Sequence, residues 1–394
     1  MSKPSSVQES PDFSLVLGGA LYQLYLRCRL VRPPLDLLPW RIVTSASIAW
    51  LPLLLLSAID GHLTGGGVPF LHDIEAHIRF LVALPVLIAA EGIVHLWIGR
   101  TVKQFIDRGI VIPDERPMFN AAIESAMRLR NSVATEIGLL IFVYTFGHWL
   151  WSEQVALRQI TWYAIFEDSG RRLTLAGYWY AFVSIPIFQF ILLRWYFRLF
   201  VWFRFLWRVS RLNLCLTPTH PDRAGGLGFL GRSSLAFGAI LFAQGALLAG
   251  LIASRIFYGG QTLMAFKVEV AGQVIFYLLV ILGPLTMFTP HLVRAKREGE
   301  YKYGRLANRY VQEFDSKWIG GGAPADEALV GSADVQSLAD MGNSYAFVRQ
   351  MRPVPFGRGV VMELVAVTVA PLLPLVLTVV PLEELIHWLI KVIL

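Results

Sequence analysis

The chain alternates long apolar runs with short polar segments, many of them basic. The hydrocarbon core of a bilayer is about 30 Å thick, so roughly 20 apolar residues span it as an α-helix. The runs expected to span a membrane are residues 42–59, 80–98, 133–151, 177–208, 233–252, 272–288 and 360–380. This pattern predicts an all-α, polytopic helical integral membrane protein with about seven transmembrane helices, accompanied by interfacial and cytoplasmic helices.

Several segments outside these runs also predict helices. Residues 13–30 are apolar but broken by Gly18-Gly19, which favours an interfacial helix, with a spanning helix as the alternative. Ser332 is a good N-cap for a helix that stops at Arg352-Pro353. Pro371 and Pro374 interrupt the last apolar run, which we expect to span, although a hairpin would also fit.

Charge sets the expected orientation and organisation. Lys and Arg gather in the loops after the second, fourth and sixth runs, which predicts a plasma (inner) membrane protein with a cytoplasmic N-terminus. The expected regions are a cytoplasmic N-terminus (1–41), a membrane domain (42–293), a cytoplasmic helical region (294–358) and a last span with an amphipathic tail (359–394). The membrane domain includes a cytoplasmic loop (100–131) and a basic aromatic helix followed by a glycine-rich turn (194–231).

Composition narrows the class further. Hydrophobic residues form 55% of the chain and charged residues 16%, which excludes an ordinary soluble domain. The formal net charge of +7 is better explained by anionic lipid beside the spans than by nucleic acid. Cys28 and Cys215 lie beside arginines in segments expected to be cytoplasmic, so we interpret them as reduced thiols. No cleaved signal peptide and no cofactor are predicted.

The helix expected at 177–208 is dense in aromatic residues and arginine. It would be about 48 Å long at 1.5 Å per residue, so it overshoots the bilayer. Its basic side chains are expected to face lipid headgroups, and they are Arg194, Arg198, Arg204 and Arg208. A helix that moves in the membrane potential is the alternative, but the usual spacing of one arginine in every three residues is absent.

A glycine-rich segment follows that helix and is the most unusual polar sequence in the chain. Glycine backbones approach anions closely and arginine adds charge, so an anion or lipid-headgroup site is one interpretation. Its candidate residues are His220, Asp222, Arg223, Gly225, Gly226, Gly228 and Arg232. The segment lacks the Lys-Ser/Thr ending of a P-loop. The alternative interpretation is a tight turn that Asp222 caps.

Three ionisable residues stand out within the expected spans. Glu91 and His95 are one helical turn apart, and Glu136 lies at nearly the same expected depth. Ionisable groups in hydrocarbon are costly and usually mark a pathway, so these residues are candidates for a proton or ion pathway. The alternative is a buried hydrogen-bonded cluster that locks helices together.

A loop at the opposite side carries possible metal ligands. His72, Asp73 and His77 are suitable ligand types, and Asp73 and His77 share one face if the helix begins early. One helix face supplies only two ligands, and loops are normally polar. The sequence therefore gives a metal site little support.

No motif fixes a reaction, a substrate or an ion. The intramembrane acids and the proline-broken helices favour a channel or transporter for protons or small ions over an enzyme. The alternatives are a membrane enzyme acting on lipid-linked or phosphate-bearing substrates and a scaffold or sensor with cytoplasmic partner-binding helices. Anionic membrane lipids are the expected partners; a homo-oligomer is a further option, and no catalytic residue is predicted.

Overall fold

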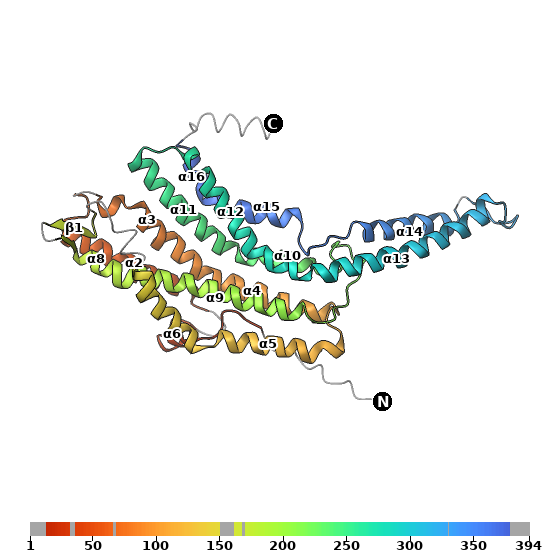
Figure 1. The fold of residues 1–394 in the computed structure, drawn as a ribbon, viewed down its shortest axis with the longest axis horizontal. Helices are drawn as coiled ribbons and strands as arrows, with labels where there is room; N and C mark the ends of the chain where they lie inside the picture. The colour runs from red at the N-terminus through yellow and green to blue at the C-terminus, as the bar shows by residue number, and fades with distance from the viewer. Residues whose placement is uncertain are drawn as a thin grey trace.

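The computed structural model describes residues 13–31, 36–65, 68–149, 161–167, 170–329 and 331–378. These residues form a bundle of long helices, and a helical arm projects from one end of it (Figure 1). A short β-hairpin lies at the other end of the bundle. The all-α prediction is confirmed, because this hairpin is the only sheet among the described residues.

The helices of the first half are α1 (Ala20–Arg27), α2 (Leu38–Ile59), α3 (Ile74–His77), α4 (Leu84–Asp107), α5 (Arg116–Arg130), α6 (Val133–Phe142), α8 (Leu175–Trp179) and α9 (Ile185–Val209). Those of the second half are α10 (Gly228–Ser233), α11 (Gly238–Gly259), α12 (Lys267–Leu282), α13 (Thr289–Phe314), α14 (Ala333–Arg349), α15 (Arg358–Val369) and α16 (Leu373–Val376). Strands β1 (Ala164–Glu167) and β2 (Gly170–Leu173) pair antiparallel, with Ala164 opposite Leu173.

Six described helical runs are long and apolar enough to cross a membrane. They are Leu38–Ile59, Ile74–Asp107, Leu175–Val209, Gly228–Gly259, Leu263–Ile319 and Arg358–Val376. Each contains most or all of one expected span. The apolar helix Val133–Gly147, at the third expected span, is shorter than the other six. The sixth expected span does not end near residue 288, because the helical run continues through a 3₁₀ segment at Gly283–Phe288 into the polar region that follows.

Prolines explain two irregular turns in the long helices. Pro85 and Pro186 each stand at the second position of an α-helix, and a π-helical turn precedes each of them, at Ile78–Ala83 and Tyr180–Ser184. Proline has no N–H and its ring clashes with the carbonyl four residues earlier. A wider turn relieves that conflict, so both helices cross the bundle with a local change of pitch and without a break.

Helix α9 lies at the centre of the bundle and packs against α4, α5 and α6. Trp195 on α9 is fully buried, and its indole N–H donates to the backbone oxygen of Leu87 at 2.8 Å. Further along α9, Phe205 stacks on Trp202 and packs against Phe119 of α5. The aromatic part of α9 is therefore largely core, where α5 covers it.

Helices α13 and α14 lie side by side and form the arm that leaves the bundle (Figure 1). The Ser332 side chain caps α14 by accepting the N–H of Asp334, as the sequence predicts. Near the tip, hydrogen bonds from Lys317 and Trp318 lower the pKa of Asp334. The predicted tail 381–394 lies outside the described residues.

The N-terminal segment does not form the single interfacial helix that its composition suggests. Residues 13–19 have no helix and pass into the bundle, where Phe13, Leu15 and Val16 are buried, and only α1 is helical. Gly18 and Gly19 explain the difference, because both have positive φ (146° and 87°), which side chains rarely adopt. A Cβ on Gly19 would also collide with the Glu136 carboxylate.

Candidate functional site

A buried ion network joins four helices inside the bundle. Glu91 on α4 accepts hydrogen bonds from Arg41 of α2 (2.6 Å) and Arg198 of α9 (2.8 Å). Arg194 lies 3.4 Å from the same Glu91 and 3.2 Å from Glu136 of α6. These five residues, the buried ion network, contain three arginines and two glutamates, and all are 6% exposed or less.

The N-terminal segment supplies further hydrogen bonds to this network. Arg194 donates to the backbone oxygen of Gly18 at 3.2 Å, and Glu136 accepts the backbone N–H of Leu21 at 2.8 Å. Buried charges need such partners because the uncompensated desolvation of each ion costs roughly several kcal/mol. The network therefore fixes the N-terminal segment and four helices relative to one another.

The network brings together two of the three residues predicted for an ion pathway. Glu91 and Glu136 share Arg194, whereas His95 Nδ1 is hydrogen-bonded to the hydroxyl of Ser14 at 2.9 Å. A carboxylate held by arginines from two other helices favours the alternative in which these acids lock the bundle. The conduction role of the three residues stays a prediction.

Two of the arginines expected to face lipid do not do so. Arg194 and Arg198 are 5% and 3% exposed and belong to the buried ion network. Arg204 donates to the Ser125 hydroxyl of α5 at 2.9 Å, and both Arg204 and Arg208 are half-buried. The expectation was wrong for the first pair because an apolar sequence does not reveal which face of a helix meets acids on other helices.

The glycine-rich segment forms a turn around its own aspartate. Asp222 accepts the backbone N–H groups of Ala224 (2.8 Å), Gly226 (3.2 Å) and Gly228 (2.8 Å), the last at the start of α10. Burial alone would raise the pKa of Asp222, but these hydrogen bonds and nearby His220 outweigh burial and lower it. The backbone N–H groups that could bind a phosphate are therefore already bonded to the Asp222 carboxylate. This geometry supports the interpretation of the segment as a tight turn.

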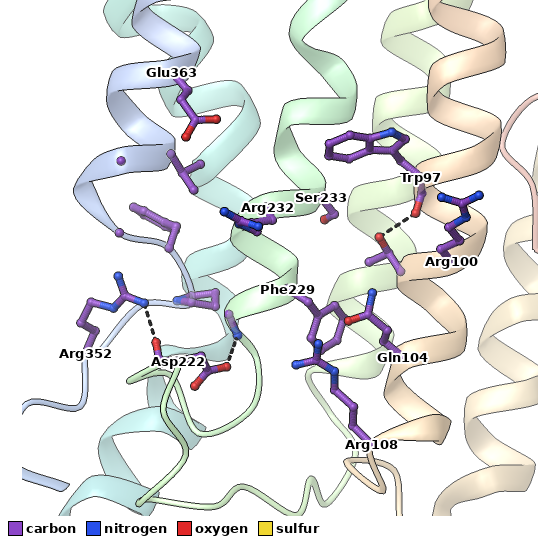
Figure 2. A pocket seen from close by; sticks show the side chains of 17 residues that line it. Trp97, Arg100, Gln104, Arg108, Asp222, Phe229, Arg232, Ser233, Arg352 and Glu363 are labelled. Carbon is purple, nitrogen blue, oxygen red and sulfur yellow. Dashed lines mark hydrogen bonds between the residues drawn. The ribbon is translucent and has the colours of Figure 1, made fainter. Parts of the chain in front are cut away.

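A pocket of about 600 Å³ lies beside that turn. Its walls are α4, α10 and the segment that leads into α15 (Figure 2). Four arginines line it, against two carboxylates, and these six residues are Arg100, Arg108, Arg232, Arg352, Asp222 and Glu363. We call this the arginine pocket.

The arginines of this pocket have few partners of their own. Arg352 donates to the backbone oxygen of Asp222 at 2.7 Å, and its buried Nε has no partner. Arg108 lies 5.1 Å from the centre of the Phe229 ring. Within the described ranges, the guanidinium groups of Arg100 and Arg232 make no hydrogen bond or ion pair. The pocket therefore carries positive charge that the protein leaves largely uncompensated.

The sequence identified only part of this pocket. Asp222, Gly228 and Arg232 line it, whereas His220, Arg223, Gly225 and Gly226 do not. Gly225 instead packs against Met351, where a Cβ would lie 3.0 Å from the methionine methyl. Arg100, Arg108 and Arg352 were missed as site residues, although Arg100 and Arg108 stand eight residues apart at the end of an apolar run, a spacing that places both near one helix face.

The predicted metal ligands are engaged elsewhere. Asp73 caps α3 and accepts the indole N–H of Trp162 at 2.8 Å. His77 is hydrogen-bonded to Trp50 at 3.0 Å. Among the described residues, no group of three or more ligand side chains is positioned to hold a metal ion, and His72 joins no such group.

No family model, curated protein or solved structure matches this chain. The class therefore rests on the molecule itself: an all-α protein whose described residues include six helices long and apolar enough to cross a membrane, with a helical arm at one end. Its most distinctive chemical feature is the arginine pocket.

Proposed function

We propose that the protein binds a phosphate-bearing amphiphile, with the anionic headgroup on the arginine pocket and the apolar chain between α4 and α15. The observation that supports this most directly is the presence of Arg100 and Arg232, without partners among the described residues, in a pocket at the end of two apolar helices. Guanidinium groups bind phosphate with paired hydrogen bonds, so this residue type suits such a ligand.

The walls beyond the arginines are apolar in the direction of the bundle centre. Trp97 lines the pocket, and Ile93 one turn further along α4 is 42% exposed. On α15, half-buried Val367 lies one turn beyond Glu363. Side chains four residues apart share one helix face, so each wall changes from charged to apolar along its length. A molecule with a charged head and an apolar tail matches this order.

The orientation that accompanies this proposal places the arm and the arginine pocket on the cytoplasmic side of the plasma membrane. Arg294, Lys296 and Arg297 begin the arm, and such clusters beside spans are retained in the cytoplasm. Reporter fusions after Gly322 should therefore report the cytoplasm, and fusions after Gly260 the outside. The reverse result would contradict the orientation.

The binding proposal is tested with the double variant Arg100→Gln/Arg232→Gln in full-length protein reconstituted in nanodiscs. Binding of a short-chain phosphatidic acid is measured beside that of the matching diacylglycerol and of glycerol phosphate. Each arginine near a phosphate contributes about 1 kcal/mol, so the double variant should bind roughly thirtyfold more weakly. Diacylglycerol should displace phosphatidic acid poorly if the phosphate is required, and glycerol phosphate should displace it poorly if the chain is required.

The matched control removes two positive charges from exposed positions, Arg128→Gln/Lys302→Gln. It keeps the same net charge as the test variant and should bind like the unmodified protein. Equal weakening in both double variants would show that only overall charge matters. If glycerol phosphate binds tightly without an apolar chain, the ligand is a free phosphate ester and not an amphiphile.

Transport of protons or small ions through Glu91, His95 and Glu136 is the competing proposal. It requires Glu91 to exchange its arginine partners during each cycle. The buried ion network gives that residue a structural role, so the binding proposal has the stronger support.

A further inference from the structure

A second cavity, also of about 600 Å³, lies in the other half of the bundle. It is a crevice between α12 on one side and α9, α11 and the π-helical turn before α4 on the other. Leu248, Phe276 and Phe188 supply apolar walls, and Gln244 and Tyr277 lie at its inner end. Because both α11 and α12 belong to candidate membrane spans, we expect the crevice to open toward lipid.

The inner end of the crevice is a chain of three polar side chains from three helices. Gln244 of α11 donates through Nε2 to the hydroxyl of Tyr196 on α9 at 3.0 Å. The hydroxyl of Tyr196 lies 3.1 Å from that of Tyr277 on α12. Gln244 and Tyr277 are each only 8% exposed, so their remaining hydrogen-bonding groups meet the crevice and little else.

Counting hydrogens shows what this chain leaves unused. The Tyr196 oxygen accepts from Gln244, and either hydroxyl of the Tyr196–Tyr277 pair can donate to the other, so one hydroxyl hydrogen of the pair has no acceptor among the described residues. When Tyr196 is the donor, that free hydrogen belongs to Tyr277, which lines the crevice. The carboxamide oxygen of Gln244 has no donor among the described residues. The crevice thus presents one donor and one acceptor side by side, and unused polar groups are costly at this depth.

The charged groups at the mouth of the crevice have partners. Arg79 donates to the hydroxyl of Tyr180 at 2.6 Å and lies 4.0 Å from Glu75. This setting differs from the arginine pocket, where positive charge is left uncompensated. The crevice therefore offers an anionic headgroup no comparable attraction, and its occupant is expected to be uncharged.

We propose that this crevice binds a membrane lipid alcohol, whose hydroxyl accepts from Tyr277 and donates to Gln244 while its chain lies along Leu248 and Phe276. A single hydroxyl group both donates and accepts, so it satisfies both unused positions at once. A cavity of this size is typical of small-molecule sites. Diacylglycerols and polyprenols share this chemistry.

The experiment uses full-length protein in nanodiscs and a photoactivatable long-chain alcohol that carries a diazirine. Labelled residues are mapped by mass spectrometry, and we expect them on α11 and α12. The methyl ether of the same probe cannot donate to Gln244, so its labelling should be at least about tenfold weaker. Competition with diacylglycerol and with polyprenol then identifies which source binds better.

Two kinds of variant separate the site from general stability. Leu248→Trp fills the crevice without touching its hydrogen bonds and should abolish labelling, and Gln244→Met removes the acceptor and should weaken it about tenfold. Tyr277→Phe is compared with Tyr144→Phe, because Tyr144 bonds the Phe182 carbonyl away from the crevice. Equal labelling by alcohol and methyl ether, or unchanged labelling in Leu248→Trp, would overturn the proposal. Neither result depends on the arginine pocket.

Discussion

The buried ion network and the arginine pocket both contain several arginines, but these arginines have different roles. In the network, Arg41, Arg194 and Arg198 each bond a glutamate inside the bundle. In the pocket, Arg100 and Arg232 have no acidic partner among the described residues, and the nearby Asp222 is committed to backbone N–H groups. The difference lies in the acids and not in the arginines.

This contrast shows how one helix serves both regions. Helix α4 carries Glu91 in its buried half and Arg100 and Arg108 near its end. In the core, Arg41, Arg194 and Arg198 each have an acid that compensates their desolvation, because an unpaired buried charge is strongly destabilising. Arginines outside that region stay near solvent, where they are available for an external anion.

The largest expected effect comes from breaking the network. Glu91→Gln leaves three arginines with only Glu136, and loss of one partner of a buried pair costs about 3–5 kcal/mol. We expect a large fall in the thermal unfolding midpoint of the purified protein. Glu124→Gln, which breaks an exposed pair with Arg128, is the control and should change the midpoint little.

The same variant separates the structural role of Glu91 from conduction. Proton flux is measured in liposomes beside the unfolding midpoint. Lost flux with an unchanged midpoint would contradict the lock and restore the transport proposal. A lowered midpoint in a protein that never conducts supports the lock.

A smaller loss of stability is expected from a substitution at Asp222. This variant compares an acid that accepts backbone N–H groups with an acid, Glu91, that pairs with arginines. Hydrogen bonds to a charged group contribute about 1.5–3 kcal/mol, so Asp222→Asn should destabilise the protein within that range at pH 7. The folded pKa of Asp222 is lowered, so its stabilisation is present above the unfolded pKa and is lost as pH falls through the folded value.

The measurement for Asp222 is the unfolding free energy of both proteins from pH 7 to pH 3. The difference between them should shrink in the acid part of that range. Asp326→Asn, at an exposed position on the arm, provides the control for loss of one negative charge. A pH-independent difference would mean that the Asp222 charge does not carry the stabilisation.

Hydropathy predicted the long helices because burial in lipid or protein requires apolar residues wherever a helix crosses. It gave no information on pairing across the bundle. Glu91 and Arg41 are fifty positions apart, and Arg352 reaches Asp222 across 130 positions. Such contacts depend on helix order and rotation, which a single sequence does not encode in any local pattern.

The glycine-rich turn shows a different limit. Its glycines fitted both an anion cradle and a capped turn, and only the position of the Asp222 side chain separates the two. The arginine pocket combines segments from three parts of the chain, of which the sequence identified one through Arg232.

The run Leu263–Ile319 has a mechanical consequence, because it is helical from the wall of the crevice to the tip of the arm. A short 3₁₀ segment with Gly283-Pro284 divides this run into an inner part and an outer arm. From Pro284 to Ile319 the outer arm is about 50 Å long at 1.5 Å per residue. A tilt of the outer arm by about 5° at the 3₁₀ segment would therefore move the tip by roughly 4–5 Å.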